Sequence, residues 1–248
     1  MISIKSEEEI KIMREAGRIL ATALRGIEKI VKPGITTLEL DMAAEALVLS
    51  QGAKPAFKGH EGFPYSLCAS INENIVHGYP SKYVLKDGDI IGLDLGVLYK
   101  GYYSDMAITV PVGKVSFEAK RLINVTKKSL RLGIKKVKPG NTIGDIGNTI
   151  QRLVESQGFG VVRSLCGHGI GKELHEDPKI PNFGKRRGGE TLKEGMVICI
   201  EPMVTAGDYN LKKSVDGYGL ATKDNSLSAH FEHTIAVTKF GARILTEL

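Results

Sequence analysis

Four carboxylates and one imidazole are the residues of this chain most able to do chemistry. Each lies in or beside an apolar, strand-like run: Asp94, Asp105, His168, Glu201 and Glu232. A carboxylate in such a run is costly to bury unless a cation compensates for its charge. Four carboxylates that converge without compensation repel one another. The economical interpretation is that they hold a pair of divalent metal ions.

Asp94 and Asp105 belong to a predicted hairpin. Residues 90–99 read as one strand and residues 102–110 as the return strand, with Lys100-Gly101 as a tight turn between them. This hairpin makes the two carboxylates opposite or diagonal neighbours, about 5 to 8 Å apart. Two carboxylates at that separation can share metal ions. The local alternative is that Asp105 is only a polar residue flanking the turn.

His168 and Glu201 are marked by their neighbours. His168 lies between Gly167 and Gly169, and glycine lets the backbone come close to a ligand. Glu201 follows an apolar run and precedes Pro202, and proline here marks the end of a strand. We therefore expect Glu201 at the end of a buried strand.

Glu232 is expected at the start of the last strand, between His230 and His233, which we interpret as structural or surface residues. An oxygen-rich ligand set with one imidazole suits Mn, Fe, Co or Zn better than a thiolate site does. Two such ions about 3.5 to 4 Å apart bridge a water and lower its pKa. The resulting hydroxide is suited to attacking an amide carbonyl.

The elements that position these residues come from an internal duplication. Three markers recur at a nearly constant offset: Lys32-Pro33-Gly34 with Lys138-Pro139-Gly140, Ser50-Gln51-Gly52 with Ser156-Gln157-Gly158, and Leu85-Lys86-Asp87-Gly88 with Leu192-Lys193-Glu194-Gly195. The first two markers of each copy enclose an amphipathic helix. The third leads into an apolar run that ends at Asp94 in one copy and at Glu201 in the other.

These copies, roughly residues 32–110 and 138–238, predict a pseudo-twofold α/β fold with the site on its axis. We expect residues 1–248 to form a single catalytic domain. A helix precedes the first copy: Ser6 and Glu9 form a capping-box pattern, and Lys32-Pro33-Gly34 ends that helix.

Composition narrows the class of protein. With 248 residues, 42% hydrophobic and 25% charged, the chain reads as a soluble globular protein. It shows no signal peptide and no apolar run long enough to span a membrane. Its three cysteines form no Cys-x-x-Cys pair, which favours a reduced, cytoplasmic setting.

The formal net charge of +6 favours either an RNA-rich partner, such as a transiently bound ribosome, or an ordinary solvated surface. The run Lys185-Arg186-Arg187 is short and lacks interleaved aromatic residues. It is not typical of a nucleic-acid reader.

Four segments together resemble the type I methionine aminopeptidases: SINENIVHGYP (70–80), GHGIGKELHEDPKIPNFG (167–184), CIEPMV (199–204) and TKDNSLSAHFEHT (222–234). The resemblance covers nearly the whole chain. It implies the pita-bread α/β fold, in which duplicated helix–strand halves surround a central curved antiparallel sheet. It also implies removal of the initiator methionine from nascent proteins, by attack of a hydroxide held between two metal ions on the first peptide bond.

Carried over by position, the resemblance assigns the five opening residues as metal ligands. Asp94 binds one ion, Asp105 and Glu232 bridge, and His168 and Glu201 complete the shell of the other. The two divalent ions are drawn from Co, Mn, Fe, Zn and Ni.

Three residues receive further roles from the resemblance. Glu201 also moves protons. His77 contacts the substrate and the tetrahedral intermediate, and His175 hydrogen-bonds the scissile peptide. The implied partners are nascent polypeptide N-termini and no membrane, with a monomer as the expected state.

Departures from the family pattern gather in one region. Residues near Phe63, Cys68, Leu174 and Tyr218 match imperfectly, and the chain contains no Trp. Pocket shape and side-chain preference are therefore left open. Two other functions are weighed: an Xaa-Pro peptidase on the same fold, whose members usually carry an extra N-terminal domain, and a binding module that has lost its metals.

Overall fold

Four long helices are present in the computed structural model, which describes residues 2–248. Three were expected: α1 (Glu7–Ile30), α2 (Thr37–Leu49) and α4 (Ile143–Ser156). Each begins with a capping box, at Ser6, Thr36 and Thr142. The fourth, α3 (Phe117–Ile134), is an addition to the elements expected from the sequence.

The strands form four sheets, and every strand pairing in residues 2–248 is antiparallel. One sheet contains β1 (Lys54–Pro55), β2 (Leu67–Ile71), β4 (Ile90–Tyr99) and β5 (Tyr102–Pro111). A five-stranded sheet has the order β15 (Gly241–Ile244), β14 (His233–Thr238), β9 (Val197–Ile200), β7 (Gly167–Gly169) and β8 (Glu176–Ile180). The expected last strand, β14, is followed by β15.

Two smaller sheets complete the set. One contains β13 (Ser228–His230), β10 (Met203–Thr205) and β6 (Gly160–Val161). The other contains β11 (Leu211–Lys213), β12 (Leu220–Thr222) and β3 (Asn74–Val76). A short 3-10 turn, η1 (His60–Gly62), precedes β2.

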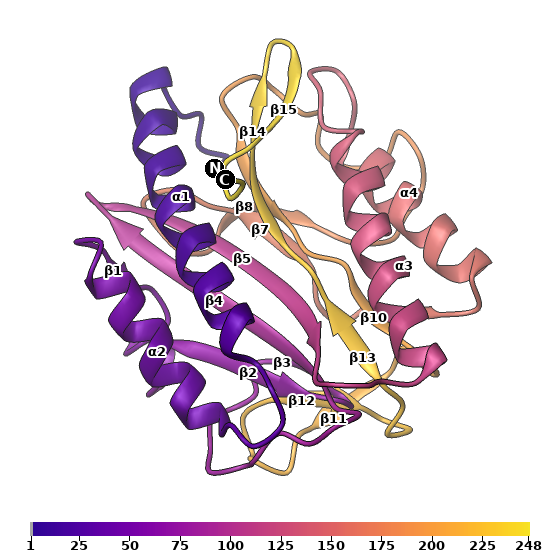
Figure 1. The fold of residues 1–248 in the computed structure, drawn as a ribbon. Helices are drawn as coiled ribbons and strands as arrows, with labels where there is room; N and C mark the ends of the chain where they lie inside the picture. Colours follow the sequence, from indigo (N-terminus) through magenta and orange to yellow (C-terminus); the bar gives the residue numbers. More distant parts are fainter. Residues whose placement is uncertain (1) are drawn as a thin grey trace.

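Hydrogen bonds join the two large sheets along β5. The Glu232 amide donates to the Ala107 carbonyl at 2.9 Å. The Thr234 hydroxyl donates to the Asp105 carbonyl at 2.8 Å and accepts from the Asp105 amide at 2.9 Å. The centre of the molecule is therefore one continuous antiparallel layer, with β5 and β14 side by side (Figure 1).

The duplication is visible in the backbone contacts. Isolated bridges join Thr36 to Val84 in the first copy and Thr142 to Thr191 in the second. The amide of Gly34 donates to Leu85 at 2.9 Å, and that of Gly140 donates to Leu192 at 3.1 Å. Equivalent residues therefore make equivalent bonds, including the one-residue slip predicted between the markers.

The copies diverge after this shared entry. Strand β4 continues past Asp94 to Tyr99, whereas β9 stops at Ile200. Pro202 has no amide hydrogen to continue a ladder, which accounts for the early end in the second copy. Asp94 thus lies mid-strand, and Glu201 lies just beyond its strand.

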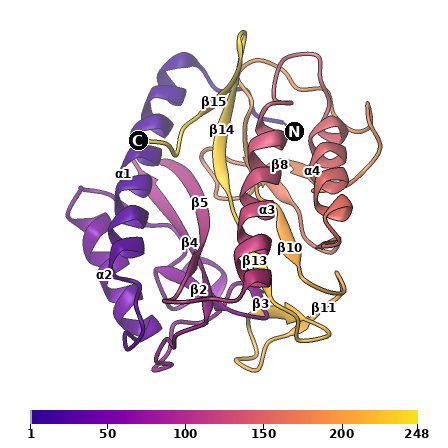
Figure 2. The same ribbon diagram turned by 45° about the vertical axis from the view of Figure 1, so that its right-hand side comes forward.

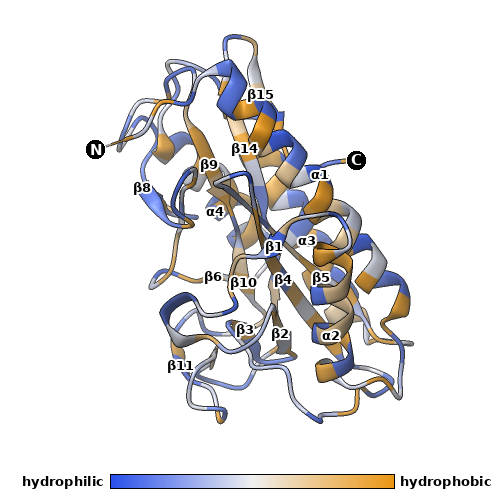
Figure 3. Cartoon of the chain, turned by 90° about the vertical axis from the view of Figure 1, so that its left-hand side faces the viewer, coloured by the Kyte–Doolittle hydropathy of each residue, from blue (hydrophilic) through white to orange (hydrophobic). Residues whose placement is uncertain are grey.

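The helices cover the sheet in two pairs. Helix α1 packs on strands β4 and β5, and α3 packs on β5, β9, β10 and β13. Helix α2 packs on α1, and α4 packs on α3 (Figures 1 and 2). Apolar residues concentrate on the strands and on the helix faces turned toward them (Figure 3). Leu24, Leu93, Ile146 and Ile198 are at most 1% exposed, and each such side chain contributes about 1.5 to 3 kcal/mol on burial. Within residues 2–248, no helix is both long and apolar enough to cross a membrane.

Candidate active site

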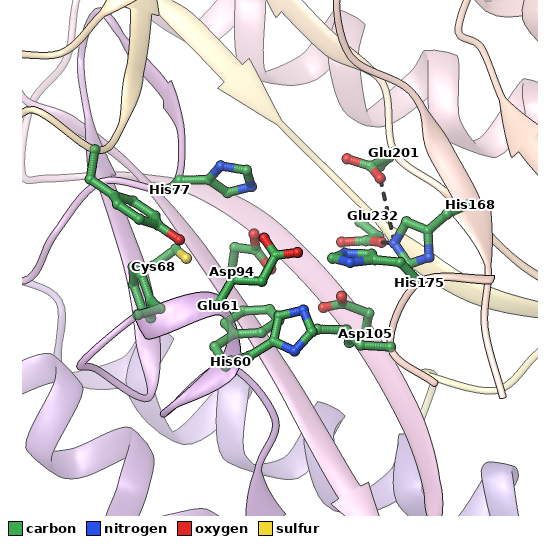
Figure 4. Close-up of a pocket in the computed structure, with 14 residues that line it drawn as sticks. His60, Glu61, Cys68, His77, Asp94, Asp105, His168, His175, Glu201 and Glu232 are labelled. Atoms are coloured by element: carbon green, nitrogen blue, oxygen red, sulfur yellow. Dashed lines mark ion pairs between the residues drawn. The ribbon is translucent and has the colours of Figure 1, made fainter. Parts of the chain in front are cut away.

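One cavity collects every residue expected to act on substrate or metal. The five expected ligands and both expected substrate-contacting histidines line it, together with aromatic and apolar residues. The lining residues are Phe57, His60, Glu61, Phe63, Cys68, His77, Asp94, Asp105, His168, Leu174, His175, Glu201, Tyr218 and Glu232. Figure 4 shows the labelled side chains in front of the strands, with helices behind.

Asp94 and Asp105 are diagonal neighbours on the predicted hairpin. Asp94 pairs with Ala107, and Asp105 pairs with Gly96, so the two carboxylates lie on the same face two positions apart. The turn residues Lys100 and Gly101 have φ of 48° and 82°, as a two-residue turn that matches the strand twist requires. Asp105 is only 4% exposed. The alternative that it merely flanks the turn is therefore wrong.

The carboxylates are held in a setting that disfavours their charge. Burial raises the pKa of Asp94, Asp105, Glu201 and Glu232 above the ordinary range. Repulsion from neighbouring carboxylates raises the pKa of Asp105 and Glu232 further. A bound cation reverses this preference, because it stabilises the ionised form.

Two of the buried oxygens that lack a hydrogen-bond partner within residues 2–248 belong to this carboxylate cluster. They are Asp94 Oδ1 and Glu232 Oε1. One oxygen from each of Asp94, Asp105 and Glu232 lies within 4.8 Å of the others. Buried polar atoms are normally paired. Orphaned acceptors in a cluster of this size fit ligation of a divalent cation.

His168 presents a free nitrogen to the carboxylates. Its Nδ1 lies 2.9 Å from the Gly169 carbonyl oxygen, which can only accept, so Nδ1 carries the hydrogen. Its Nε2 is 3.8 Å from Glu201 Oε1 and 3.9 Å from Glu232 Oε1. Burial and the neighbouring His175 lower the pKa of His168 to about 4. The ring is therefore neutral at pH 7, with its lone pair aimed as a metal ligand requires.

His77 and His175 approach the carboxylates from two separate segments (Figure 4). Burial lowers the pKa of His77 to about 4 and lowers that of His175 as well. The His175 ring packs edge-on against His168, with ring centroids 4.6 Å apart. Each neutral imidazole keeps one N–H, which can donate to a bound peptide.

Three further residues of the site were not singled out as functional from the sequence. His60 and Glu61 of η1 line the cavity, and Glu61 has φ of 46°. The only sequence pattern that could have indicated a role for His60 and Glu61 is Gly-His-Glu-Gly at residues 59–62. His230 is 3% exposed, and its Nε2 lies 3.3 Å from Glu201 Oε2. His230 is thus not a surface residue.

His233 matches the structural interpretation. Its Nδ1 lies 2.8 Å from the Thr246 hydroxyl, and burial lowers its pKa to about 4. Among the residues of the pocket that depart from the family pattern, Phe63 and Tyr218 have ring centroids 5.5 Å apart, and Tyr218 stacks on Tyr79 at 4.8 Å. The pocket beside the carboxylates is therefore walled by aromatic rings despite the absence of Trp.

Residues 11–239 match the model of metallopeptidase family M24. The chain belongs to this family. It is 50% identical to methionine aminopeptidase of Clostridium perfringens, over 99% of both chains. It is 49% identical to methionine aminopeptidase 1 of Bacillus subtilis, over the full length of both.

Two solved structures that match the chain share its fold. The structure of methionine aminopeptidase from Thermotoga maritima matches with a TM-score of 0.98 and 45% identity, over all of both chains. Prolidase from Pyrococcus furiosus matches with a TM-score of 0.81 and 27% identity, over 99% of this chain but 65% of the prolidase. The predicted pita-bread α/β fold and the resemblance to methionine aminopeptidases are confirmed.

Proposed function

We propose that the chain is a metal-dependent aminopeptidase that removes the N-terminal methionine from nascent polypeptides, with residues 1–248 acting as one catalytic domain. The observation that carries the proposal is the meeting of His168 with the buried carboxylates of Asp105, Glu201 and Glu232 and the half-buried Asp94 in one cavity. The full-length similarity to proteins named methionine aminopeptidase gives that cavity its reaction class. The prolidase likeness supports the Xaa-Pro alternative less, because it is lower in identity and covers less of that protein.

Asp94, Asp105, His168, Glu201 and Glu232 would hold two divalent ions from the set Co, Mn, Fe, Zn and Ni. Asp94 would hold one ion, His168 and Glu201 would hold the other, and Asp105 and Glu232 would contribute to both. When bound, such ions polarise a carbonyl and lower the pKa of a water toward neutrality. The orphaned oxygens of Asp94 and Glu232 and the free Nε2 of His168 support this assignment.

Glu201 is the proposed proton carrier. It sits just past the end of β9, where its backbone carbonyl accepts from the Asn182 side chain at 2.9 Å. With metal bound the Glu201 carboxylate would be ionised. Burial, which favours its protonated form, would then favour its taking a proton from an attacking water. The same proton can then pass to the leaving amine.

His77 and His175 are the proposed donors to substrate. Both rings line the cavity and are neutral at pH 7. An N–H fixed beside the reacting carbonyl stabilises charge that develops on its oxygen. The aromatic wall that includes Phe63 and Tyr218 would receive the methionine side chain.

The proposal extends to the setting of the enzyme. We infer that it acts in the cytoplasm as a monomer, on nascent chains, with transient association with the ribosome. The basic net charge of the chain and its full-length similarity to proteins named methionine aminopeptidase support this setting.

Release of methionine from Met-Ala-Ser in the presence of Mn or Co tests the proposal, with Ala-Pro-Ala as the comparison substrate. We expect cleavage of the first and none of the second, and two metal ions per chain by mass spectrometry. Glu201→Gln should abolish turnover, while the same exchange at exposed Glu194 should leave it unchanged. Cleavage of Ala-Pro-Ala alone would point to the Xaa-Pro peptidase instead.

A further inference from the structure

The positive charge of the chain is concentrated on one helix pair. Residues 117–156, which span α3 and α4, hold nine Lys and Arg against three Asp and Glu, a net charge of +6. Residues 7–49, which span α1 and α2, hold six Lys and Arg against eight Asp and Glu, a net charge of −2. The two pairs occupy equivalent places in the duplication, so the fold itself does not require the positive charge.

A groove runs along the positive pair, between the end of α3, the polar side of α4 and the loop that follows β8. Its basic lining consists of Lys135, Lys136, Lys138, Arg152 and Arg186. All five side chains are exposed. In residues 2–248, no ion pair is formed by any of the five.

The one carboxylate that lines the groove belongs to Asp145 and accepts hydrogen bonds from two backbone amides. Asp145 accepts from the amide of Thr142, the N-cap residue of α4, and from the amide of Arg187 at 3.2 Å. These backbone bonds lower the pKa of Asp145, with Arg186 adding a smaller attraction. Asp145 therefore stays ionised and supplies a single negative charge against the five cations that line the groove.

The positive charge is not explained by helix stability. Lys128, Arg131 and Lys135 recur at three- and four-residue spacing on α3, where like charges repel and destabilise a helix. In the first copy the positions equivalent to Lys128, Lys136 and Arg152 are Thr22, Ile30 and Ala46. The second copy has thus gained cations at three places where the first has none.

We propose that this α3–α4 groove binds the phosphate backbone of RNA. Closely spaced cations on an exposed groove, with no aromatic residue in its lining, suit sequence-independent contact with phosphates rather than base reading. The choice of RNA over another polyanion rests on the proposed function, because nascent chains emerge beside ribosomal RNA. The helices lie behind the strands that carry the catalytic side chains (Figure 4), so an RNA held there leaves the cavity free.

The test measures binding of a fluorescently labelled RNA duplex, and of purified ribosomes, across a range of salt concentrations. Lys135→Glu with Lys138→Glu should weaken RNA binding by about tenfold or more and flatten the slope of log K against log salt by about two. The matched control is Lys29→Glu with Lys32→Glu, the equivalent pair of the first copy, which should leave both quantities unchanged. The neutral pair Lys135→Gln with Lys138→Gln serves if the charge reversal fails to fold.

Several outcomes would overturn the proposal. They are equal loss of RNA binding in the control pair, unchanged RNA binding in the groove variants, and tighter groove-dependent binding of polyglutamate or anionic vesicles than of RNA. Cleavage of free Met-Ala-Ser is measured on the same samples and should be unchanged in both pairs. An enzyme that binds RNA through the groove but releases no methionine would refute the proposed function and leave the groove assignment standing.

Discussion

The two copies of the helix–strand unit share their entry, which is the capped helix and the turn that leads into the strand. They differ at their exit, which is the end of that strand, β4 in the first copy and β9 in the second. At the entry, Thr36 and Thr142 cap equivalent helices, and the turns before the strands place Gly88 and Gly195 at φ of 100° and 85°. At the exit, β4 runs for ten residues and β9 for only four. The shared entry builds the fold, while the different exits place the carboxylates.

Asp94 and Glu201 differ in how firmly the backbone holds them, because Asp94 lies within β4 and Glu201 follows the end of β9. Asp94 is fixed in mid-strand, diagonal to Asp105 on the same face. Glu201 has left its strand, and its carboxylate lies near His168 and His230. A residue that must move protons benefits from this release, whereas a residue that only anchors an ion benefits from the rigid ladder.

The comparison predicts its largest effects at these two positions. Asp94→Asn and Glu201→Gln should each lower kcat/KM on Met-Ala-Ser by about 10²- to 10⁴-fold. Asp94→Asn should also lose one bound ion, because the anchor is removed. Steady-state kinetics and metal analysis check both effects, with Glu194→Gln as the control. Two variants with equal metal content and equal kinetics would contradict the division between anchor and proton carrier.

Without metal, the neighbouring carboxylates of Asp94, Asp105, Glu201 and Glu232 should repel one another and destabilise the folded protein. Burial raises the pKa of Glu201 from 4.5 to about 8, so without metal the folded state holds a proton that the unfolded state has released. Burial also lowers the pKa of His77, His168 and His233 from 6.5 to about 4, which opposes this effect at lower pH. The metal-free protein should therefore lose stability as the pH rises from about 6.5 to 8. Saturating metal, at about 100 times its Kd, should add about 2.7 kcal/mol.

Thermal unfolding of metal-free and metal-loaded protein at pH 6.5 and pH 8 measures this linkage. We expect the gap in Tm between the two forms to be wider at pH 8. A metal-free protein whose Tm is constant or rises over that interval would show that the carboxylates are not strained in the empty site.

The features that could be predicted from the sequence depend on residues close together in the chain or on a match between the two copies. The Ser6–Glu9 capping box, the turn at Lys100 and the equivalence of Asp94 with Glu201 each rest on residues a few positions apart or on a match between copies. The diagonal register of Asp94 and Asp105 was left open, because alternation alone fits both registers. The two-residue turn at Lys100-Gly101 pairs Tyr99 with Tyr102 and thereby fixes the diagonal one.

Other features depended on neighbours that are distant in the sequence. The burial of His230 follows from the bonds that Thr109 makes to its backbone, at 2.8 and 2.9 Å. His60 reaches the cavity only through the path of η1. Helix α3 did carry a local signal, since the Ser116 side chain accepts from the Ala119 amide, so the extent of the duplicated helices was recognisable from the residues.

A smaller difference between the copies is expected at their equivalent glycines. Both positive φ values disfavour a side chain, which costs about 1 kcal/mol in each copy. At Gly195 a Cβ would also meet the Lys5 carbonyl oxygen at 2.9 Å and Ile4 Cγ2 at 2.6 Å, whereas at Gly88 the nearest atom is 3.9 Å away. Gly195→Ala should therefore destabilise the protein by roughly 2 kcal/mol and Gly88→Ala by about half of that. Urea denaturation ranks the two, and equal losses would mean that the N-terminal segment moves aside.

The smallest effects are expected where the copies are most alike. The Thr36 and Thr142 hydroxyls each accept from the amide three residues later, at 3.2 and 3.3 Å. In return, the Thr36 amide donates to the Glu39 carboxylate and the Thr142 amide donates to the Asp145 carboxylate. Replacing either by Ala removes one cap and should cost about 1 kcal/mol in each copy. Thr36→Ser and Thr142→Ser keep the hydroxyl and serve as controls in the same urea titrations. A clearly larger loss at Thr142 would show that its bridge to Thr191, rather than the cap, stabilises the second copy, and the shared entry would then differ in energy though not in geometry.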